Sequence, residues 1–472
     1  MDGYKKAVGG SEEELSALLT QYKTPYSFLL THDLPNETIL LTEKTTVTLS
    51  NIAISEKLFF VLLEKTKVAV GKRFSITKHD DNKDCIREHG MTIETPFYLE
   101  RIYEAMSSLA LENIKGIPSN SIGCALKEII LHDTGLINIL SKLRINEDCE
   151  IKEISLDTNK KEHVAEILAQ DQTVFVLRVK TIDLEGYAVS ILPKLIIHKD
   201  SMVERLSLYG SEKEHVAAVL EQGQVFWVGR VKKVELRDYA VSTLLKLGIH
   251  KGCEVGWLWL DADEKEHVAE IHKQDRTICV GRVKNMDLKD YAVSVVVKMK
   301  IHKDCKVELL RMAASKEEHV AEILEHDQGF CVGRVKRMRL RGYAVSVITK
   351  LRIHEDNTMD EFVLVADRRT RLRTLLKKYY QIAISFPRTS TLSLVSVTDT
   401  KTSASLDGGI FRERDISIEL GRIRLGGFKA PRGNRRKPRY ILVDGMGNEV
   451  LEKESDGEET APSDGEASGM GD

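Results

Sequence analysis

The central part of the chain is a fourfold repeat with a period of 52 residues. Three short sequences recur at this spacing: Glu-His-Val-Ala, Tyr-Ala-Val-Ser and Ile-His. Their marker residues are His163, His215, His267 and His319, then Tyr187, Tyr239, Tyr291 and Tyr343, then His198, His250, His302 and His354. A fixed period of this kind is typical of a solenoid, in which each unit contacts its neighbours. The repeat therefore limits the chain to folds that stack similar coils.

Each period divides into one unit of 28 residues and one of 24. In every unit, apolar residues occupy the first, fourth and sixth positions of a short extended run. The nine runs are 151–156, 179–184, 203–208, 231–236, 255–260, 283–288, 307–312, 335–340 and 359–364. Because successive side chains of a strand point to opposite faces, the polar positions between the apolar ones face away from the core. We therefore expect nine strands whose apolar triads share one core.

Each run is followed by a segment with the apolar spacing of a helix. Segments of the first type follow residues that favour helix N-caps: Asn159, Ser211, Asp263 and Ser315. Segments of the second type begin at the Tyr-Ala-Val-Ser sequences. Pro193 lies in one of them and would disturb a long helix, so this segment is expected to be short or 3-10 helical.

The triads and their spacing resemble the leucine-rich repeat, Leu-x-x-Leu-x-Leu-x-x-Asn/Cys-x-Leu, which has roughly 20–29 residues per unit. Over residues 126–364 the alternation of two unit types is most similar to the ribonuclease-inhibitor-like class. The resemblance implies an α/β solenoid shaped like a horseshoe, with a parallel sheet on the concave face and helices on the convex face. The chain departs from the family in the second unit type, where Tyr187 and its equivalents stand at the asparagine position. Tyrosine cannot copy the backbone bonds of asparagine, so the form of these loops stays open.

The flanking segments predict a cap at each end of the array. Residues 1–44 form an N-terminal cap with a helix over 11–19, and residues 45–150 hold irregular leucine-rich repeats at 47–49, 74–76 and 106–111. The regular repeats span 151–366. Residues 367–451 form a C-terminal cap with a basic helical stretch over 368–378, strands at 392–397 and 440–443, and the basic segment 412–439. Residues 452–472 contain eight acids and one lysine, which predicts a disordered acidic tail.

Charge and hydropathy limit the classes of function. The net charge is −2, which argues against bulk binding of nucleic acid. No run of 18 apolar residues occurs, so we expect no membrane-spanning segment and an intracellular protein. The cytoplasm is the expected compartment, and the nucleus is added if Arg435–Lys437 is an import signal rather than a phosphate-binding patch or a loop balanced by the acidic tail.

The cysteines and histidines follow the repeat and do not predict a metal site. Cys149, Cys253 and Cys305 share a repeat position with Ser201, and Cys279 and Cys331 share another with Phe175 and Trp227. Such exchanges indicate packing positions, and we expect reduced thiols. Eight of the fourteen histidines are repeat positions and are expected to be structural. We find no nucleophile or phosphate-binding motif, and therefore predict neither enzyme activity nor a cofactor or metal.

The polar strand positions are the candidate binding surface, because the repeats agree at core positions and differ here. Trp257 and Trp259 both fall on polar positions and are the predicted anchors. Tryptophan and arginine are the residues most often found as interface hot spots. The predicted binding residues that flank them are Lys233, Glu235, Arg237, Asp287 and Arg311, and the predicted surface also includes Arg337, Arg339 and Arg341 further along the sheet. Along the sheet the charge changes from acidic, at 153–185, to basic, at 337–341, which would orient a partner.

These features predict a protein-binding scaffold or regulator that acts through its concave face. Three alternatives remain: the sensing portion of a nucleotide-binding leucine-rich-repeat receptor, a GTPase-activating regulator of a small GTPase, and nucleic-acid binding through the basic segment 412–439. The first would add a P-loop domain, and the second a catalytic arginine loop; the sequence contains neither motif. Ser455 and Ser463 lie in acidic surroundings and are candidate phosphorylation sites.

Overall fold

The computed structural model describes most of the chain between residues 24 and 367 and four later strands. The described ranges are 24–33, 38–90, 95–146, 148–170, 175–198, 201–248, 254–275, 278–301, 305–325, 329–352, 360–367, 392–397, 419–424, 428–429 and 439–443. The predicted helices at 11–19 and 368–378, the acidic tail, Ser455, Ser463 and Arg435–Lys437 lie outside these residues.

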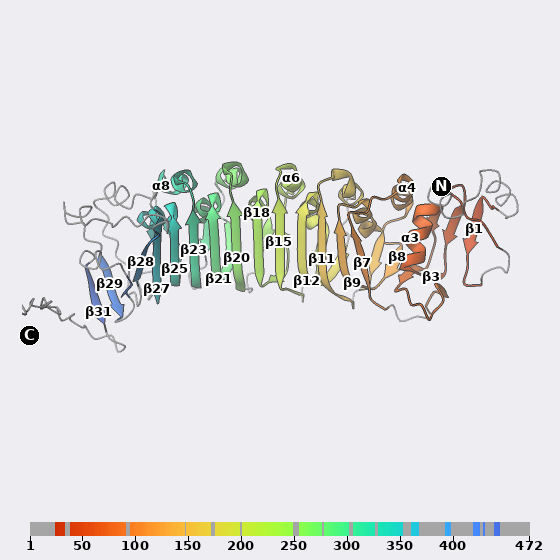
Figure 1. Cartoon of the computed structure of the whole chain (residues 1–472), viewed down its shortest axis with the longest axis horizontal. Helices are drawn as coiled ribbons and strands as arrows, with labels where there is room; N and C mark the ends of the chain where they lie inside the picture. Colours follow the sequence, from red (N-terminus) through yellow and green to blue (C-terminus); the bar gives the residue numbers. More distant parts are fainter. Residues whose placement is uncertain are drawn as a thin grey trace, which may run out of the picture.

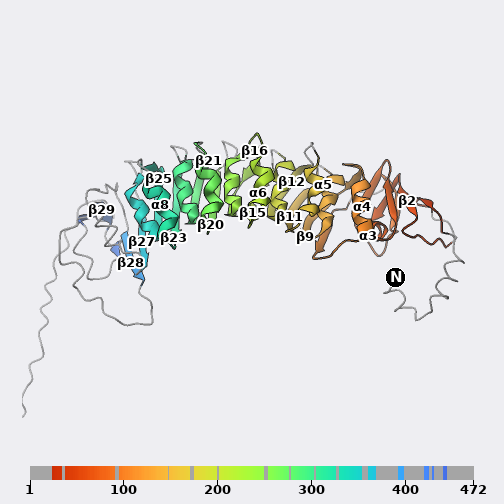
Figure 2. The same ribbon diagram turned by 90° about the horizontal axis from the view of Figure 1, so that it is seen from above.

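The regular repeats build one long parallel sheet in an elongated α/β body (Figure 1). The strands are β7 (Phe97–Ile102), β9 (Leu126–His132), β11 (Glu150–Thr158), β12 (Phe175–Gly186), β15 (Arg205–Gly210), β18 (Lys233–Asp238), β20 (Glu254–Ala262), β21 (Ile278–Asp290), β23 (Lys306–Ala314), β25 (Arg334–Gly342), β27 (Glu361–Asp367), β28 (Leu392–Val397) and β30 (Phe428–Lys429). They lie in this order, and each pairs in parallel with the next. Figure 2 shows a gentle bend along the body, with strands such as β11 and β20 on its inner side.

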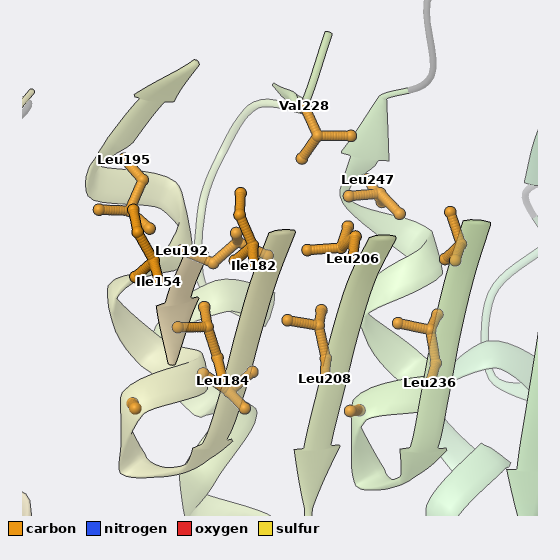
Figure 3. Packing of buried hydrophobic residues seen from close by; sticks show 14 of the residues in the cluster. Ile154, Ile182, Leu184, Leu192, Leu195, Leu206, Leu208, Val228, Leu236 and Leu247 are labelled. Carbon is orange, nitrogen blue, oxygen red and sulfur yellow. The ribbon is translucent and has the colours of Figure 1, made fainter. Parts of the chain in front are cut away.

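The predicted runs lie in strands of this sheet, except that Val203 and Val231 lie in short strands directly before β15 and β18 and that Met359 lies outside the described residues. In the eight runs from 151–156 to 335–340, every triad residue is at most 2% exposed. In the ninth run, the triad residue Phe362 lies in β27 and is buried. Figure 3 shows how Leu184, Leu208 and Leu236 of neighbouring strands pack in a row together with apolar residues of the connecting segments. Each buried leucine or valine stabilises the fold by about 1.5–3 kcal/mol, so the stacked coils share one continuous source of stability.

The connecting segments are shorter than ordinary helices and mostly 3-10. Three of the first type combine a 3-10 turn and a short α-helix: η2 (Lys161–His163) with α5 (Ala165–Leu168), η5 (Lys265–Val268) with α7 (Ala269–His272), and η7 (Glu317–Val320) with α8 (Ala321–Glu325). The fourth is the α-helix α6 (Glu214–Leu220) alone. Those of the second type are η3 (Tyr187–Lys194), η4 (Tyr239–Leu245), η6 (Tyr291–Lys298) and η8 (Tyr343–Thr349). The 3-10 form predicted from Pro193 is confirmed, but proline is not its cause, because the three segments without proline adopt it too.

The predicted N-caps are wrong. The helices begin one or two residues later, after Lys160, Lys213, Glu264 and Lys316, and none of Asn159, Ser211, Asp263 and Ser315 occupies the cap position. The repeat histidine accepts a backbone hydrogen bond at the start of the segment instead: Nδ1 of His215 accepts from the backbone N–H of Glu212, at 3.3 Å. His267 makes the same bond with Glu264, at 3.4 Å. The local propensity of the cap residues is therefore overridden by a buried ring.

A ladder of aromatic contacts joins successive units. The rings of Tyr187 and His215 lie 4.7 Å apart, and the next two pairs, one repeat and two repeats later, lie 4.6 and 4.4 Å apart. Each tyrosine therefore packs on the Glu-His-Val-Ala histidine of the following unit. This contact accounts for a tyrosine, rather than an amide side chain, at the start of each second-type segment.

Acidification is expected to destabilise the chain as the pH falls below about 6.5, the ordinary pKa of histidine. Burial lowers the pKa of His163, His215, His272 and His319, so the unfolded chain takes up these protons at a higher pH than the folded chain. Stability is thus fully present above that pH and is lost below it. Carboxyl groups whose pKa is raised by burial, such as those of Asp157 and Asp287, act in the opposite sense at more acidic pH. A melting temperature that stays constant between about pH 7.5 and about pH 6 would contradict this expectation.

The N-terminal region is less regular than the array. One sheet holds β1 (Ser27–Leu30), β2 (Thr46–Leu49) and β4 (Lys67–Val70), and another holds β3 (Ile52–Ser55), β5 (Phe74–Thr77), β6 (Ile86–Glu88), β8 (Ile122–Cys124) and β10 (Leu143–Ile145). The expected strands at 47–49 and 74–76 are present, with helix α3 (Glu56–Lys65) and the 3-10 helix η1 (Gly135–Lys142) between strands. The expected repeat strand at 106–111 is wrong, because Ser107 caps helix α4 (Ser108–Gly116) there. Buried Asn113 of this helix bonds to the backbone of Leu63, Thr66 and Val68.

A second row of short paired strands lies on the other side of the coils. It consists of β13 (Leu195–Ile197) with β12, β16 (Phe226–Trp227) with β19 (Leu247–Gly248), β22 (Met299–Ile301) with β21, and β24 (Phe330–Cys331) with β26 (Leu351–Arg352). The short strands β14 (Met202–Val203) and β17 (Arg230–Val231) pair with each other directly before β15 and β18 and carry the triad residues Val203 and Val231. Later in the chain, β29 (Glu419–Arg424) pairs with β31 (Arg439–Val443). The strand predicted at 392–397 is present as β28, and the strand predicted at 440–443 is present within β31.

The packing predicted for the cysteine positions holds for one repeat position and fails for the other. Buried Cys305 bonds to both backbone groups of Val283, as Ser201 does to Val179. Cys279 and Cys331, in contrast, are exposed on the second row of strands. Among the six cysteines in the described part of the chain, no disulfide is formed.

Candidate interaction surface

The face of the large sheet opposite the connecting segments carries the polar strand positions, and we call it the open face. Trp257 and Trp259 lie on it, two residues apart on β20, and alternate with the buried core residues Leu258 and Leu260. Both indoles are half-buried. Because β20 is paired on both sides, the backbone beneath the indoles is held by neighbouring strands.

Neighbouring strands bring the predicted flanking residues to the two indoles. Lys233 and Glu235 of β18 are the register partners of Trp257 and Trp259, and Asp287 of β21 is the partner of Trp259 on the other side. Two arginines cover the rings: the guanidinium carbon of Arg237 lies 4.6 Å from the Trp259 ring centroid, and that of Arg311 lies 5.8 Å from the Trp257 centroid. Such cation–π contacts contribute roughly 0.5–1 kcal/mol at exposed sites. They also hold the indoles in place before any partner arrives.

Ion pairs fix the charged groups around the indoles. Arg311 reaches a carboxylate oxygen of Asp287 at 3.5 Å, and Lys289 reaches Asp261 at 2.9 Å. Lys233 pairs with Glu235 along its own strand. Burial raises the pKa of Asp287, although the Arg311 guanidinium opposes this by favouring the charged carboxylate. The site thus presents aromatic and cationic groups whose positions are already set.

The predicted basic residues Arg337, Arg339 and Arg341 lie further along the sheet. They lie on the open face of β25, three strands from β20, which is about 14 Å at the ordinary strand spacing. Arg339 pairs with Glu361 of the next strand, at 3.1 Å. Arg339 is also the register partner of Arg311, which covers Trp257, so the ten predicted residues form one band along the same face with the tryptophans toward one end and these arginines at the other.

The acidic part of the open face lies at the other end of the regular array. Asp183 and Glu185 of β12 are register partners of Ser155 and Asp157 of β11. Burial, together with repulsion among these carboxylates, raises the pKa of Asp157 and of Glu185. Arg205 of β15 reaches Asp183 at 3.5 Å and compensates one of the charges. The acidic-to-basic order along the sheet therefore follows the sequence.

Asp238, Asp263 and His267 have metal-ligand atoms within 4.8 Å of one another. They lie where strands β18 and β20 end, away from the indoles. Nδ1 of His267 is 3.3 Å from Asp263 and 3.7 Å from Asp238, while Tyr239 packs on the ring. The same Nδ1 accepts the Glu264 amide, so this histidine serves the loop of its own unit.

Sequence reasoning missed the contacts that arise between units. The tyrosine–histidine ladder, the Asp238–His267 pair and the arginines over the indoles each join residues that lie 22 or more positions apart in the sequence. The sequence contains a signal for the tyrosine–histidine ladder, because tyrosine and histidine recur at fixed positions of the repeat. Recognising the contact also requires the offset between neighbouring coils, which only the register of the sheet supplies.

Comparison of the chain with protein-family models, with curated proteins and with solved structures found no match. Among the described residues, no helix is both long and apolar enough to cross a membrane.

Proposed function

We propose that the chain is a leucine-rich-repeat protein of the ribonuclease-inhibitor-like class that binds a protein partner through the open face of its sheet. The observation that carries the proposal is the pair of half-buried indoles on β20, each covered by an arginine from another strand. Aromatic and arginine side chains are the commonest interface hot spots. A preformed surface loses little conformational entropy on association, which favours affinity.

The two groups on the open face have different roles in this proposal. Trp257 and Trp259 supply apolar area that a partner can desolvate, and Arg237 and Arg311 supply donors at its edge. The acidic end near Glu185 and the basic end near Arg341 orient a partner of opposite polarity and speed its association. Work of this kind requires binding and no chemical step, and we therefore place the protein among intracellular scaffolds or regulators.

Replacing both Trp257 and Trp259 by alanine is expected to abolish partner capture. Each hot-spot tryptophan contributes about 2 kcal/mol or more, so each loss should weaken binding by about 30-fold or more. The measurement is quantitative capture from native cells by the wild type and the double variant, with affinity then measured for the partner that is identified. Melting temperatures of both proteins show whether the fold is kept.

Trp227→Ala is the matched control. This third tryptophan is 58% exposed, but it lies on β16 in the second row of strands. The proposal requires capture to survive this substitution and to be lost in the double variant. Equal loss in both variants, or full capture by the double variant, would rule out the open face as the binding surface.

A further inference from the structure

The loop over residues 78–85 brings a thiol, an imidazole and a carboxylate into one line of contacts. Sγ of Cys85 lies 3.8 Å from Nδ1 of His79, and Nε2 of the same ring lies 3.0 Å from Oδ1 of Asp81. Cys85 is exposed. We propose that Cys85 is a nucleophilic modification site for soft carbon electrophiles, with His79 as its general base and Asp81 as a positioning residue. This proposal is independent of the open face.

Asp81 selects the form of the ring that the thiol needs. A neutral imidazole has one N–H and one bare nitrogen, and the partner of the N–H decides which is which. The carboxylate of Asp81 only accepts hydrogen bonds, so Nε2 carries the hydrogen and donates it. The lone pair of Nδ1 then points to Cys85 and can take its proton. Nucleophile, base and orienting group follow the general logic of activated nucleophiles.

The strands on either side hold the loop in this shape. β5 precedes the loop and β6 follows it, and both strands pair with β3. The backbone N–H of Ser55, at the end of β3, donates to the carbonyl of Cys85 at 2.8 Å. Within the loop, the backbone N–H of Asn82 donates to Oδ1 of Asp80, and the Lys83 ammonium lies 3.2 Å from Asp80. Cys85 and His79 therefore approach each other from two anchored ends.

The reaction balances without any further group. The thiol of Cys85 gives its proton to Nδ1 of His79, and the thiolate attacks the electrophilic carbon. With iodoacetamide, the sulfur–carbon bond forms as the carbon–iodine bond breaks, and iodide leaves with the bonding electrons. The imidazolium then releases the proton to water. Asp81 stabilises the imidazolium while it carries the charge.

The experiment measures alkylation of the full chain by iodoacetamide at about pH 7, followed cysteine by cysteine with mass spectrometry of peptides. Exposed Cys279 and Cys331 serve as reference thiols in the same molecule. An ordinary thiol is only a few per cent thiolate at this pH, so full ionisation raises the rate at most about 30-fold. His79 supplies part of this gain by taking the proton of Cys85, and we expect Cys85 to react about tenfold faster than the references.

Substitutions separate the base from its orienting group. His79→Asn should bring Cys85 to the rate of the reference thiols. Asp81→Asn should slow it several-fold, whereas Asp84→Asn, which removes an equal charge from the same loop, should change the rate little. Equal rates for all three thiols, or an unchanged rate in His79→Asn, would overturn the proposal. Equal slowing by Asp81→Asn and Asp84→Asn would overturn the positioning role of Asp81.

Discussion

Replacing Leu258 by alanine is expected to lower the free energy of unfolding by about 3 kcal/mol. Leu258 is fully buried, and its register partners Val234 and Met286 are buried beside it. Alanine would leave a cavity that the rigid stack of strands cannot close, so the cost exceeds the loss of apolar contact alone. The effect should be among the largest for any single truncation on β20.

Trp257→Ala, one position earlier on the same strand, is the comparison that shows which face of β20 is buried. Trp257 is the larger side chain, but it stands on the open face and is only half-buried. We expect a cost of about 1 kcal/mol, from partial burial and the contact with Arg311. Urea denaturation of both variants supplies the two free energies. A larger loss for Trp257→Ala than for Leu258→Ala would mean that β20 has the opposite face in the core.

The parallel sheet could be predicted because its determinants are local and repeated. The triad of Val255, Leu258 and Leu260 indicates which face of the strand is buried. Eight further copies of that pattern remove the doubt, which a single short run would leave, over whether the run is a strand. The alternating 28- and 24-residue spacing then fixes which strands are neighbours. The long parallel sheet follows from these two facts alone.

The connecting segments could not be predicted in the same way, because contacts between coils decide them. Asn159 and Ser211 have the local preference of N-caps, but buried His215 holds the loop after Ser211, and the helix starts later. At 106–111, three apolar residues looked like a strand, whereas Ser107 and Asn113 make the segment a helix. Short apolar runs suit either structure until their neighbours are known.

The strand positions of the candidate site were predictable, and the side-chain contacts within it were not. Alternation alone places Trp257, Trp259 and Arg339 on the open face, where the structure has them. The distance between the tryptophans and Arg339 depends on how many strands intervene, which also follows from the repeat. The arginines that cover the rings were among the predicted residues, but their direction depends on side-chain contacts across two strands.

Gly186→Ala is expected to destabilise the chain by about 3 kcal/mol, through the turn that joins each second-type strand to its 3-10 segment. Gly186 has φ 63° and ψ −139°, a conformation that side chains rarely adopt. An added Cβ would also collide with the carbonyl oxygen of Thr158 in the neighbouring coil. Strain and collision both act in the folded state, and neither can relax without shifting a strand.

Gly116→Ala is the matched control for chain entropy. Gly116 ends helix α4, and a Cβ there would meet open space, so alanine should stabilise the fold by up to about 1 kcal/mol. The two substitutions reduce the freedom of the unfolded chain equally. Their difference in melting temperature therefore reports the turn alone, and similar temperatures for both variants would show that the turn tolerates a side chain.

Aspartate occupies the position of Gly186 in two other units, which allows a further test of the strain in this turn. Asp290 has φ 51° and ψ −126°, nearly the backbone conformation of Gly186. Its Oδ1 accepts hydrogen bonds from the backbone N–H and the hydroxyl of Ser315, at 3.0 and 2.8 Å, and lies 2.9 Å from Nδ1 of His319. These bonds offset strain of about 1–3 kcal/mol. Alanine at position 290 would keep the strain and lose the bonds, whereas glycine would lose both. Asp290→Ala should therefore melt at a lower temperature than Asp290→Gly, and the reverse order would show that the carboxylate does not compensate the turn.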